Sequence, residues 1–189
     1  MDPEEAECER LLQAGDPESI PRLLKRFQRP IFSFLYHCVG DRSAAEDLVQ
    51  EVFVRVWRRR DSYEARGKLA SWLFTIARRL AMDFSEKRGR RRTEPLDAAT
   101  VGVRPLVETL ADEKEAPERV AERTATRRRI EEAIAELPEG QRDVFLLREY
   151  GGLSFKEIAR MSDCPLGTAL ARMRYAVLKL RKALGDVYA

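Results

Sequence analysis

Residues 153–182 read LSFKEIARMSDCPLGTALARMRYAVLKLRK. Ser154 and Glu157 have the spacing of a capping box, in which the serine oxygen accepts a backbone N–H and the glutamate accepts the serine's own. The apolar residues that follow predict a short helix. Residues 162–164 predict a tight connection, and Pro165 suits the first position of a longer helix. A short helix, a brief turn and a longer basic helix together predict a helix-turn-helix.

Such a motif places its second helix in the DNA major groove, while the first helix braces it against the backbone. Side chains off the apolar stripe of the second helix are therefore candidates to reach bases or phosphates, and Lys179 a candidate for phosphates. The candidates, with two at the start of the first helix, are Ser154, Lys156, Thr168, Arg172, Arg174, Tyr175 and Lys179. An ordinary helical hairpin with a solvated basic face is the alternative interpretation of this segment alone.

Helical periodicity recurs on the N-terminal side of this motif. Apolar residues at three- and four-residue spacing predict helices that include residues 23–39, 48–57 and 72–84. Gly40 followed by Asp41 predicts a helix stop and then an N-cap, and Ser71 predicts the cap of the third helix. Residues 120–137 and 141–150 predict two more helices, and strand-like alternation is lacking. We therefore expect an all-α fold.

The segment of residues 93–117 divides the chain. It contains several prolines and has weak periodicity, which are typical of a linker. It is also acidic, since residues 94–122 carry eight acidic and three basic side chains. We expect two small helical domains, residues 1–92 and 118–189, joined by a flexible acidic linker over residues 93–117.

The charge distribution says more than the net charge of +3. Residues 78–92 contain seven basic and two acidic side chains, and residues 165–185 contain five basic and no acidic ones. Two basic segments on either side of an acidic one indicate two contacts with a polyanion.

Several function classes find no support in the sequence. The apolar stretches near residues 31–36 and 72–77 are too short for a membrane span, and the acidic N-terminus is unlike a signal peptide, so we expect a cytoplasmic protein. Three scattered cysteines and one histidine do not make a zinc site. Catalytic triads and glycine-rich phosphate loops are also lacking, so we expect neither an enzyme nor a cofactor.

Four separated blocks carry a resemblance to a known family. Residues 43–57, SAAEDLVQEVFVRVW, resemble the polymerase-binding helix of sigma factors, and residues 70–79, ASWLFTIARR, with Asp83, resemble their promoter-melting helix. Residues 137–147, LPEGQRDVFLL, and 152–159, GLSFKEIA, resemble the start of their second domain. In this order and spacing, the blocks resemble the extracytoplasmic-function (ECF) group of sigma-70-like factors.

For residues 1–92, the resemblance implies sigma region 2, which binds the β′ clamp helices of core RNA polymerase and opens the −10 element. The positions that match its polymerase-facing residues are Asp47, Gln50 and Glu51, with Arg55 beside them. Its base-capturing loop matches residues 61–70, with Tyr63, Arg66 and Lys68 as candidates. Strand phosphates would be held by Arg78, Arg79, Lys87, Arg88, Arg90 and Arg91. We expect Phe53, Trp57 and Trp72 to pack in the core instead.

For residues 118–189, the resemblance implies sigma region 4, whose helix-turn-helix binds the −35 element. The linker would thread through the nucleic-acid channel of the polymerase, whose β subunit is a further expected contact. Members of the group are commonly held inactive by an anti-sigma factor. A helix-turn-helix regulator that acts without polymerase is the alternative, although it leaves residues 43–57 and 70–92 without a role.

The recognition helix departs from the family pattern. Leu170 stands where a phosphate-binding lysine is common, and Val177 replaces another frequent basic residue. Lost phosphate contacts weaken affinity and its salt dependence. An exposed leucine could instead contact a thymine methyl or a protein partner. Arg79 also stands where the family often has asparagine, which leaves the −10 base preference open.

Overall fold

The computed structural model describes the backbone of residues 3–64, 68–91 and 117–185, and the side chains of these except at 89–91 and 117–123. Every regular element in these ranges is a helix, which confirms the predicted fold class. The elements are α1 (Pro3–Gln13), α2 (Ser19–Val39), α3 (Arg42–Arg58), the short 3-10 helix η1 (Arg60–Ser62), α4 (Leu69–Arg91), α5 (Pro117–Ala135), α6 (Glu139–Glu149), α7 (Phe155–Met161) and α8 (Leu166–Leu184). Nearly all of the predicted linker, residues 93–117, lies outside the described residues.

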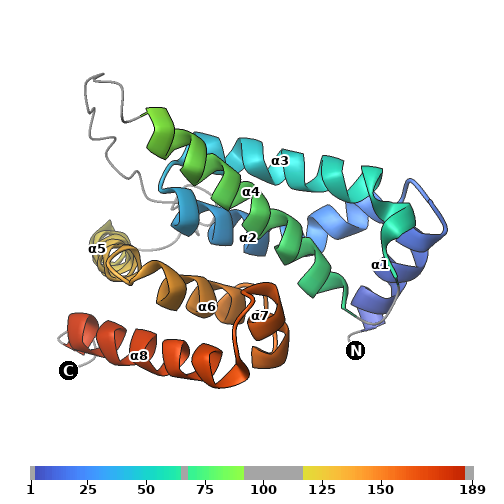
Figure 1. The fold of residues 1–189 in the computed structure, drawn as a ribbon. Helices are drawn as coiled ribbons and strands as arrows, with labels where there is room; N and C mark the ends of the chain where they lie inside the picture. Colours follow the sequence, from blue (N-terminus) through green and yellow to red (C-terminus); the bar gives the residue numbers. More distant parts are fainter. Residues whose placement is uncertain (1–2, 65–67, 92–116, 186–189) are drawn as a thin grey trace.

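The N-terminal half is built on α2, α3 and α4, which pack along one another (Figure 1). Their apolar stripes meet in a core that contains the fully buried Phe34 and Phe74, whose rings lie edge to face with centroids 5.5 Å apart. The stop between α2 and α3 is as predicted. Gly40 has φ 70° and ends α2, and Asp41 caps α3 by accepting the amide of Ala44 at 2.8 Å.

The start of α4 differs from the prediction. The helix begins at Leu69, so Ser71 lies inside its first turn rather than at the N-cap. Ser71 instead uses its backbone oxygen to accept the Thr75 hydroxyl at 2.8 Å. An early amide of α4, that of Ala70, donates to the Glu5 carboxylate at 3.2 Å. The prediction of Ser71 as cap was wrong because a side chain distant in the sequence satisfies this helix end.

Helix α1 carries that side chain and was not among the predicted helices. Its Cys8, Leu11 and Leu12 are buried. Glu9 is 5% exposed and accepts the hydroxyl of Tyr63 at 2.5 Å. The acidic composition of α1 hides a narrow apolar stripe, which becomes significant only where the helix meets α2 and η1.

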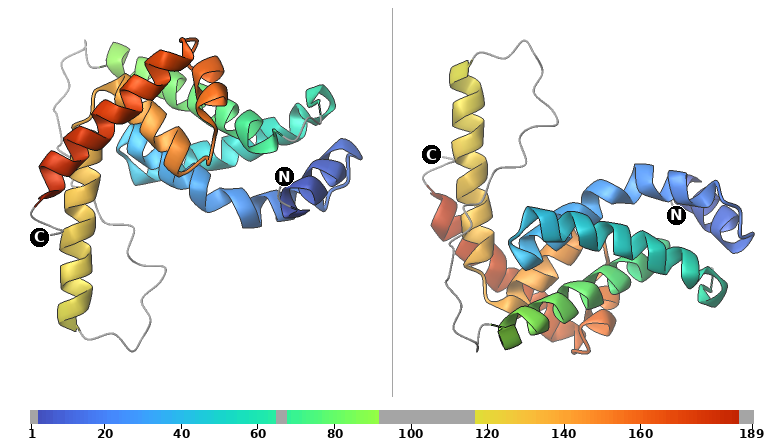
Figure 2. Two further views of the ribbon diagram at one scale, coloured as in Figure 1. Left: turned by 90° about the horizontal axis from the view of Figure 1, so that it is seen from below. Right: turned by 90° about the horizontal axis from the view of Figure 1, so that it is seen from above.

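The C-terminal half comprises α5 to α8, and α8 packs against the other three helices. The predicted capping box is present, since the Ser154 amide donates to Glu157 at 2.9 Å and the Glu157 amide donates to the Ser154 hydroxyl at 3.3 Å. Helix α8 begins at Leu166, one residue later than predicted, and Pro165 is its N-cap. Helices α7 and α8 form the predicted helix-turn-helix. Helix α5 projects beyond the rest of the molecule (Figure 2).

The two halves pack against each other through α2, α5 and α6, and their buried residues form one continuous cluster. His37 of α2 and Tyr150, which follows α6, lie with the His37 Nε2 and the Tyr150 hydroxyl 3.0 Å apart and their rings stacked. The backbone of Gly151 comes so close to Phe74 that a β-carbon there would lie 3.4 Å from its ring. None of the described helices has the length and apolar character needed to cross a membrane.

Candidate polymerase and nucleic-acid interface

The exposed face of α3 carries the residues predicted to contact polymerase. Asp47 and Gln50 are exposed, whereas Glu51 and Arg55 are half-buried and paired, with Arg55 Nε 2.7 Å from the Glu51 carboxylate. Val54 lies on the same face, with 41% of its surface exposed. Val54 was not among the predicted contact residues, because its apolar side chain resembles those of the core positions around it. The opposite face packs in the core through Val49, Val52 and Phe53, which confirms the expectation for Phe53.

Helix α4 carries the basic side chains predicted to hold the −10 strand, and they are not equally accessible. Arg79, Lys87 and Arg88 are exposed, and Lys68 is exposed immediately before the helix. Arg88 donates to the carbonyl of Val39 at 3.3 Å. Arg66 lies outside the described residues, as do the side chains of Arg90 and Arg91.

Arg78 is engaged by the other half of the chain. Its Nε lies 2.7 Å from the Asp143 carboxylate of α6, and its Nη1 donates to the carbonyl of Met161 in α7 at 3.4 Å. The two paired side chains retain only 22% and 16% of their exposure. No local pattern predicts this pair, because its members are 65 residues apart.

Tyr63 is placed in the core rather than on the surface. Only 7% of it is exposed, its hydroxyl donates to Glu9, and its ring lies 4.7 Å from that of Trp72. Burial and then the bond to Glu9 raise the pKa of the Tyr63 phenol. In this conformation, stacking on an extruded base would require the ring to leave both neighbours. Trp72 and Trp57 are half-buried, and the Arg60 guanidinium lies 4.3 Å from the centroid of Trp57.

A basic groove of about 280 Å³ lies between α4 and α7. Cations from both halves line it, together with polar side chains and one carboxylate: Lys68, Ser71, Thr75, Arg78 and Arg79 on one side, and Glu157, Arg160 and Met161 on the other. Arg160 was not among the predicted site residues. The groove shows that the predicted −10 surface faces the first helix of the helix-turn-helix.

The long basic helix α8 exposes most of its predicted DNA-binding residues. Arg174, Lys179 and Tyr175 are exposed, Tyr175 to 57%. Thr168 and Arg172 are half-buried, and the Arg172 guanidinium lies beside Gly140 at the start of α6, where a β-carbon would come within 3.2 Å of it. In α7, Lys156 is exposed, whereas the Ser154 hydroxyl is held 2.6 Å from the Glu157 carboxylate.

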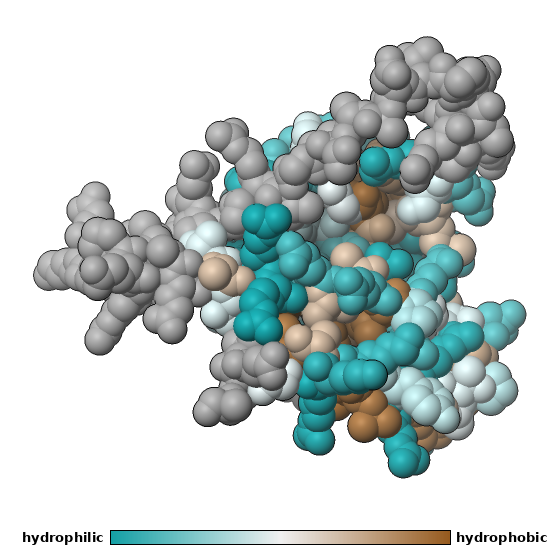
Figure 3. All heavy atoms as spheres, turned by 90° about the vertical axis from the view of Figure 1, so that its left-hand side faces the viewer, coloured by the Kyte–Doolittle hydropathy of each residue, from teal (hydrophilic) through white to brown (hydrophobic). Residues whose placement is uncertain are grey.

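The face of the molecule that is on the left in Figure 1 is largely hydrophilic, with smaller hydrophobic areas (Figure 3).

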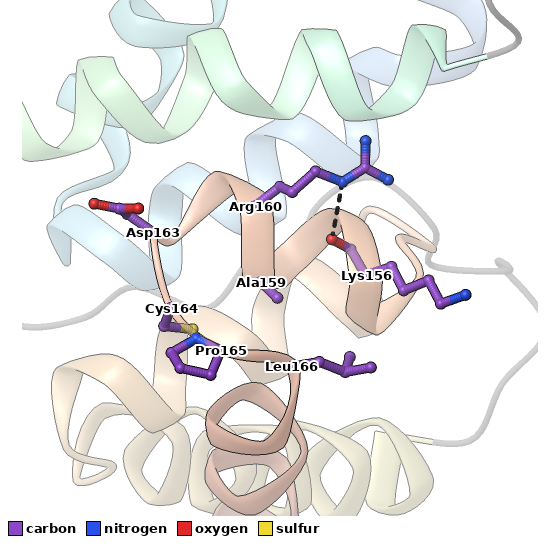
Figure 4. A pocket seen from close by; sticks show the side chains of 7 residues that line it. All are labelled: Lys156, Ala159, Arg160, Asp163, Cys164, Pro165 and Leu166. Atoms are coloured by element: carbon purple, nitrogen blue, oxygen red, sulfur yellow. Dashed lines mark hydrogen bonds between the residues drawn. The ribbon is translucent and has the colours of Figure 1, made fainter.

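An open cavity of about 600 Å³ separates α7 from the start of α8 (Figure 4). Its walls are Lys156, Ala159 and Arg160 of α7, Asp163, Cys164 and Pro165 of the turn, and Leu166 of α8. Arg160 Nε donates to the carbonyl of Lys156 at 3.3 Å.

Cys38 of α2 lies away from this cavity. Burial raises the pKa of its thiol to about 12, so that this cysteine stays protonated and unreactive.

Comparisons with known proteins agree with this architecture. Residues 23–91, which span α2 to α4 apart from the first residues of α2, match the family description "Sigma-70 region 2". Residues 127–180, from α5 into α8, match "Sigma-70, region 4". The RNA polymerase sigma-H factor of Pseudomonas aeruginosa is 30% identical over 173 residues, which are 92% of this chain and 90% of that protein. The ECF RNA polymerase sigma-E factor of Escherichia coli is 30% identical over 181 residues, covering 93% and 89%.

The chain belongs to the ECF group of the sigma-70 family.

Two solved structures share the fold of this sigma factor. The sigma factor RpoE of Bartonella quintana, in complex with the anti-sigma factor NepR, has 24% identity and a TM-score of 0.68, and the match covers 87% of this chain and 96% of that one. CnrH, in complex with the cytosolic domain of CnrY, has 19% identity and a TM-score of 0.64, with 98% and 99% covered.

Membership of this family establishes the role of the chain in general terms. A sigma factor directs transcription initiation, for which it acts with core RNA polymerase and promoter DNA. Its relatives are regulatory factors rather than enzymes. Helices α3 and α4 lie within region 2, and the helix-turn-helix of α7 and α8 lies within region 4 apart from the end of α8.

Proposed function

We propose that this sigma factor binds core polymerase through the exposed face of α3, recognises and opens the −10 element with α4, and binds the −35 element with α7 and α8. The proposal rests mainly on the helix-turn-helix, whose second helix exposes basic side chains. Residues 165–185, which include this helix, contain no acidic residue. The site of action is the cytoplasm, where the polymerase and its template are found.

The face of α3 fits a protein contact because it combines an apolar centre with polar edges. Val54 is exposed between the polar Gln50 and Glu51 on one side and Arg58 on the other. Asp47 lies one turn before Gln50 and Glu51. Interfaces commonly place such an apolar residue within a polar rim. We assign this face to the β′ clamp helices.

Helix α4 fits a single strand because its cations run along the helix. Lys68, Arg79 and Lys87 are accessible as the molecule stands, whereas Arg78 becomes available to a phosphate only when its bond to Asp143 is broken. Contact of Arg78 with the −10 strand therefore requires α6 and α7 to move away from α4.

An anti-sigma factor is a further proposed partner. Both structural relatives were solved as complexes with such a protein or with a partner domain. We infer that an anti-sigma factor also binds this chain and that it competes with polymerase for the α3 face.

Reconstitution with purified core polymerase tests the proposal. The chain and core are mixed and transcription is run from a fragmented bacterial genome, with the 5′ ends of the transcripts mapped. The expected result is a set of transcripts that share a bipartite upstream motif. The Asp47→Ala, Gln50→Ala double variant should lose core binding, whereas Glu132→Ala, an exposed carboxylate of α5, should keep it.

A folded chain that fails to bind core polymerase would overturn the proposal. A symmetric palindromic footprint made by the chain alone would support the stand-alone regulator instead.

A further inference from the structure

The first two turns of α8 expose an apolar surface where a DNA-reading helix usually exposes polar groups. Leu166 is 40% exposed and Leu170 is 46% exposed. Four residues apart, they lie one above the other on the same face of the helix. Gly167 and Ala171, beside them, are small and exposed. The core is formed by another face of α8, through Ala169, Ala176 and Leu180.

Polar side chains are scarce in the same two turns. Thr168 is half-buried, and the Arg172 guanidinium is directed to Gly140 of α6 rather than alongside the leucines. Arg174 is the first exposed cation of the helix. The N-terminal part of a recognition helix enters the groove most deeply, so the part of α8 that would lie nearest to the base edges offers mainly carbon atoms.

The surroundings favour a polyanion on this face. Leu166 borders the cavity whose opposite helix supplies Lys156 and Arg160, while Asp163 lies on the far side of the cavity (Figure 4). Further along α8, Arg174, Lys179 and Arg181 are exposed. A β-carbon at Gly167 would meet nothing within 4 Å, so the groove wall can approach the backbone there. Cations around an apolar centre match phosphates around a base-pair edge.

We propose that Leu166 and Leu170 determine promoter specificity by packing against thymine methyl groups in the major groove of the −35 element. The C5 methyl of thymine is the apolar feature of that groove, and it distinguishes T·A from the other pairs. The proposal rests on the proposed function, since it requires α7 and α8 to bind the −35 element. Each methyl contact should contribute about fourfold to affinity, as expected for one buried methyl group.

Replacing thymine by deoxyuridine tests the contact directly, because the exchange removes the methyl and keeps the base pair. The reconstituted holoenzyme is used with a promoter it has itself selected, and each −35 thymine is replaced in turn. Wild type should lose about fourfold in affinity at one or two positions. Leu166→Ala and Leu170→Ala should each bind more weakly and become insensitive to deoxyuridine at one of these positions.

Leu178→Ala is the matched control. It is a leucine of the same helix, 51% exposed, two turns further on, and it should leave the sensitivity to deoxyuridine unchanged. Alanine is a strong helix former, so the exposed substitutions should not unfold α8.

Three results of the DNA experiments would overturn the inference. They are a selected −35 element without T·A pairs, equal affinity for thymine and deoxyuridine at every position, and a deoxyuridine effect that persists in both leucine variants. Loss of transcription in the leucine variants with DNA affinity intact would identify the pair as a protein contact and overturn it as well. Scrambling the −35 element separates the proposals: no effect removes −35 binding itself, whereas a large effect without methyl sensitivity removes only this inference.

Discussion

The two basic surfaces of this sigma factor, on α4 and on α8, share a pattern of apolar and basic residues but differ in their availability to DNA. Both helices turn an apolar stripe to the core and cations to the other side. On α4, Arg78 is bound to Asp143 at 2.7 Å and α7 forms the other wall of the neighbouring groove. On α8, Arg174, Tyr175 and Lys179 face solvent. The α8 surface can therefore meet DNA as it stands, whereas the full α4 surface requires the two halves to separate.

Acidification should destabilise the chain through His37, which contacts Tyr150 between the two halves. Burial, followed by the cations Arg127 and Arg142, lowers the pKa of His37 from 6.5 to about 4. His37 is thus neutral in the folded chain, while the unfolded chain takes up a proton below pH 6.5. The contribution of neutral His37 to the free energy of unfolding is therefore fully present above pH 6.5 and is lost as the pH falls towards 4. The loss is about 3 kcal/mol in total and about 2 kcal/mol by pH 5.

Urea unfolding at pH 7 and pH 5 measures this loss. His37→Gln should remove most of the pH dependence between these values, where carboxylates remain largely ionised. An equal loss in wild type and variant would show that protonation of His37 does not cause the pH dependence.

Asp143→Asn should release Arg78 and strengthen binding of a single-stranded −10 oligonucleotide by the chain alone. Breaking this largely buried pair should weaken the contact between the halves by about 2 kcal/mol. Glu149→Gln, an exposed carboxylate at the end of α6, is the control and should change nothing. If Asp143→Asn and Arg78→Ala,Asp143→Asn bind the strand equally well, Arg78 does not hold it.

The α8 surface should respond to charge removal without any opening step. Arg174→Ala and Lys179→Ala should each weaken −35 duplex binding several-fold and reduce the slope of log affinity against log salt by about 1. The losses should be the same in an Asp143→Asn background if the two surfaces bind DNA independently. Losses that depend on Asp143 would show that the two surfaces are coupled.

The smallest effect concerns the N-terminal cap of α7, the first helix of the helix-turn-helix. Ser154→Ala removes the hydroxyl of the capping box and should destabilise the chain by about 1 kcal/mol. Thermal unfolding measures the change, with the exposed Ser85→Ala of α4 as the control. Strand binding by α4 should be unaffected, and a fall in it would contradict the independence of the two surfaces.

Features governed by short-range rules were predictable from the sequence. The stop at Gly40, the cap at Asp41, and the capping box of Ser154 and Glu157 each follow from residues within one helical turn of one another. The features that were missed are contacts between distant residues. Glu5 caps α4, Glu9 holds Tyr63 in the core, and Asp143 binds Arg78, and each pairing depends on tertiary packing that periodicity does not encode.

For the same reason, the residues of the candidate site were predicted from the sequence, but their pairing and their burial were not. The cations of α4 were identified, yet nothing in their spacing shows that Arg78 is already occupied. Leu170 stood out because it departs from the family pattern, whereas the exposure of Leu166 required the structure.

Permanganate reactivity of promoter thymines, which reports unpaired bases, tests most directly that the chain directs promoter opening. Holoenzyme reconstituted with the wild-type chain should make thymines of the −10 element reactive on a promoter that it selects, and core polymerase alone should not. Arg79→Ala should reduce that reactivity while −35 protection persists. Reactivity that is the same with and without the chain would contradict the account.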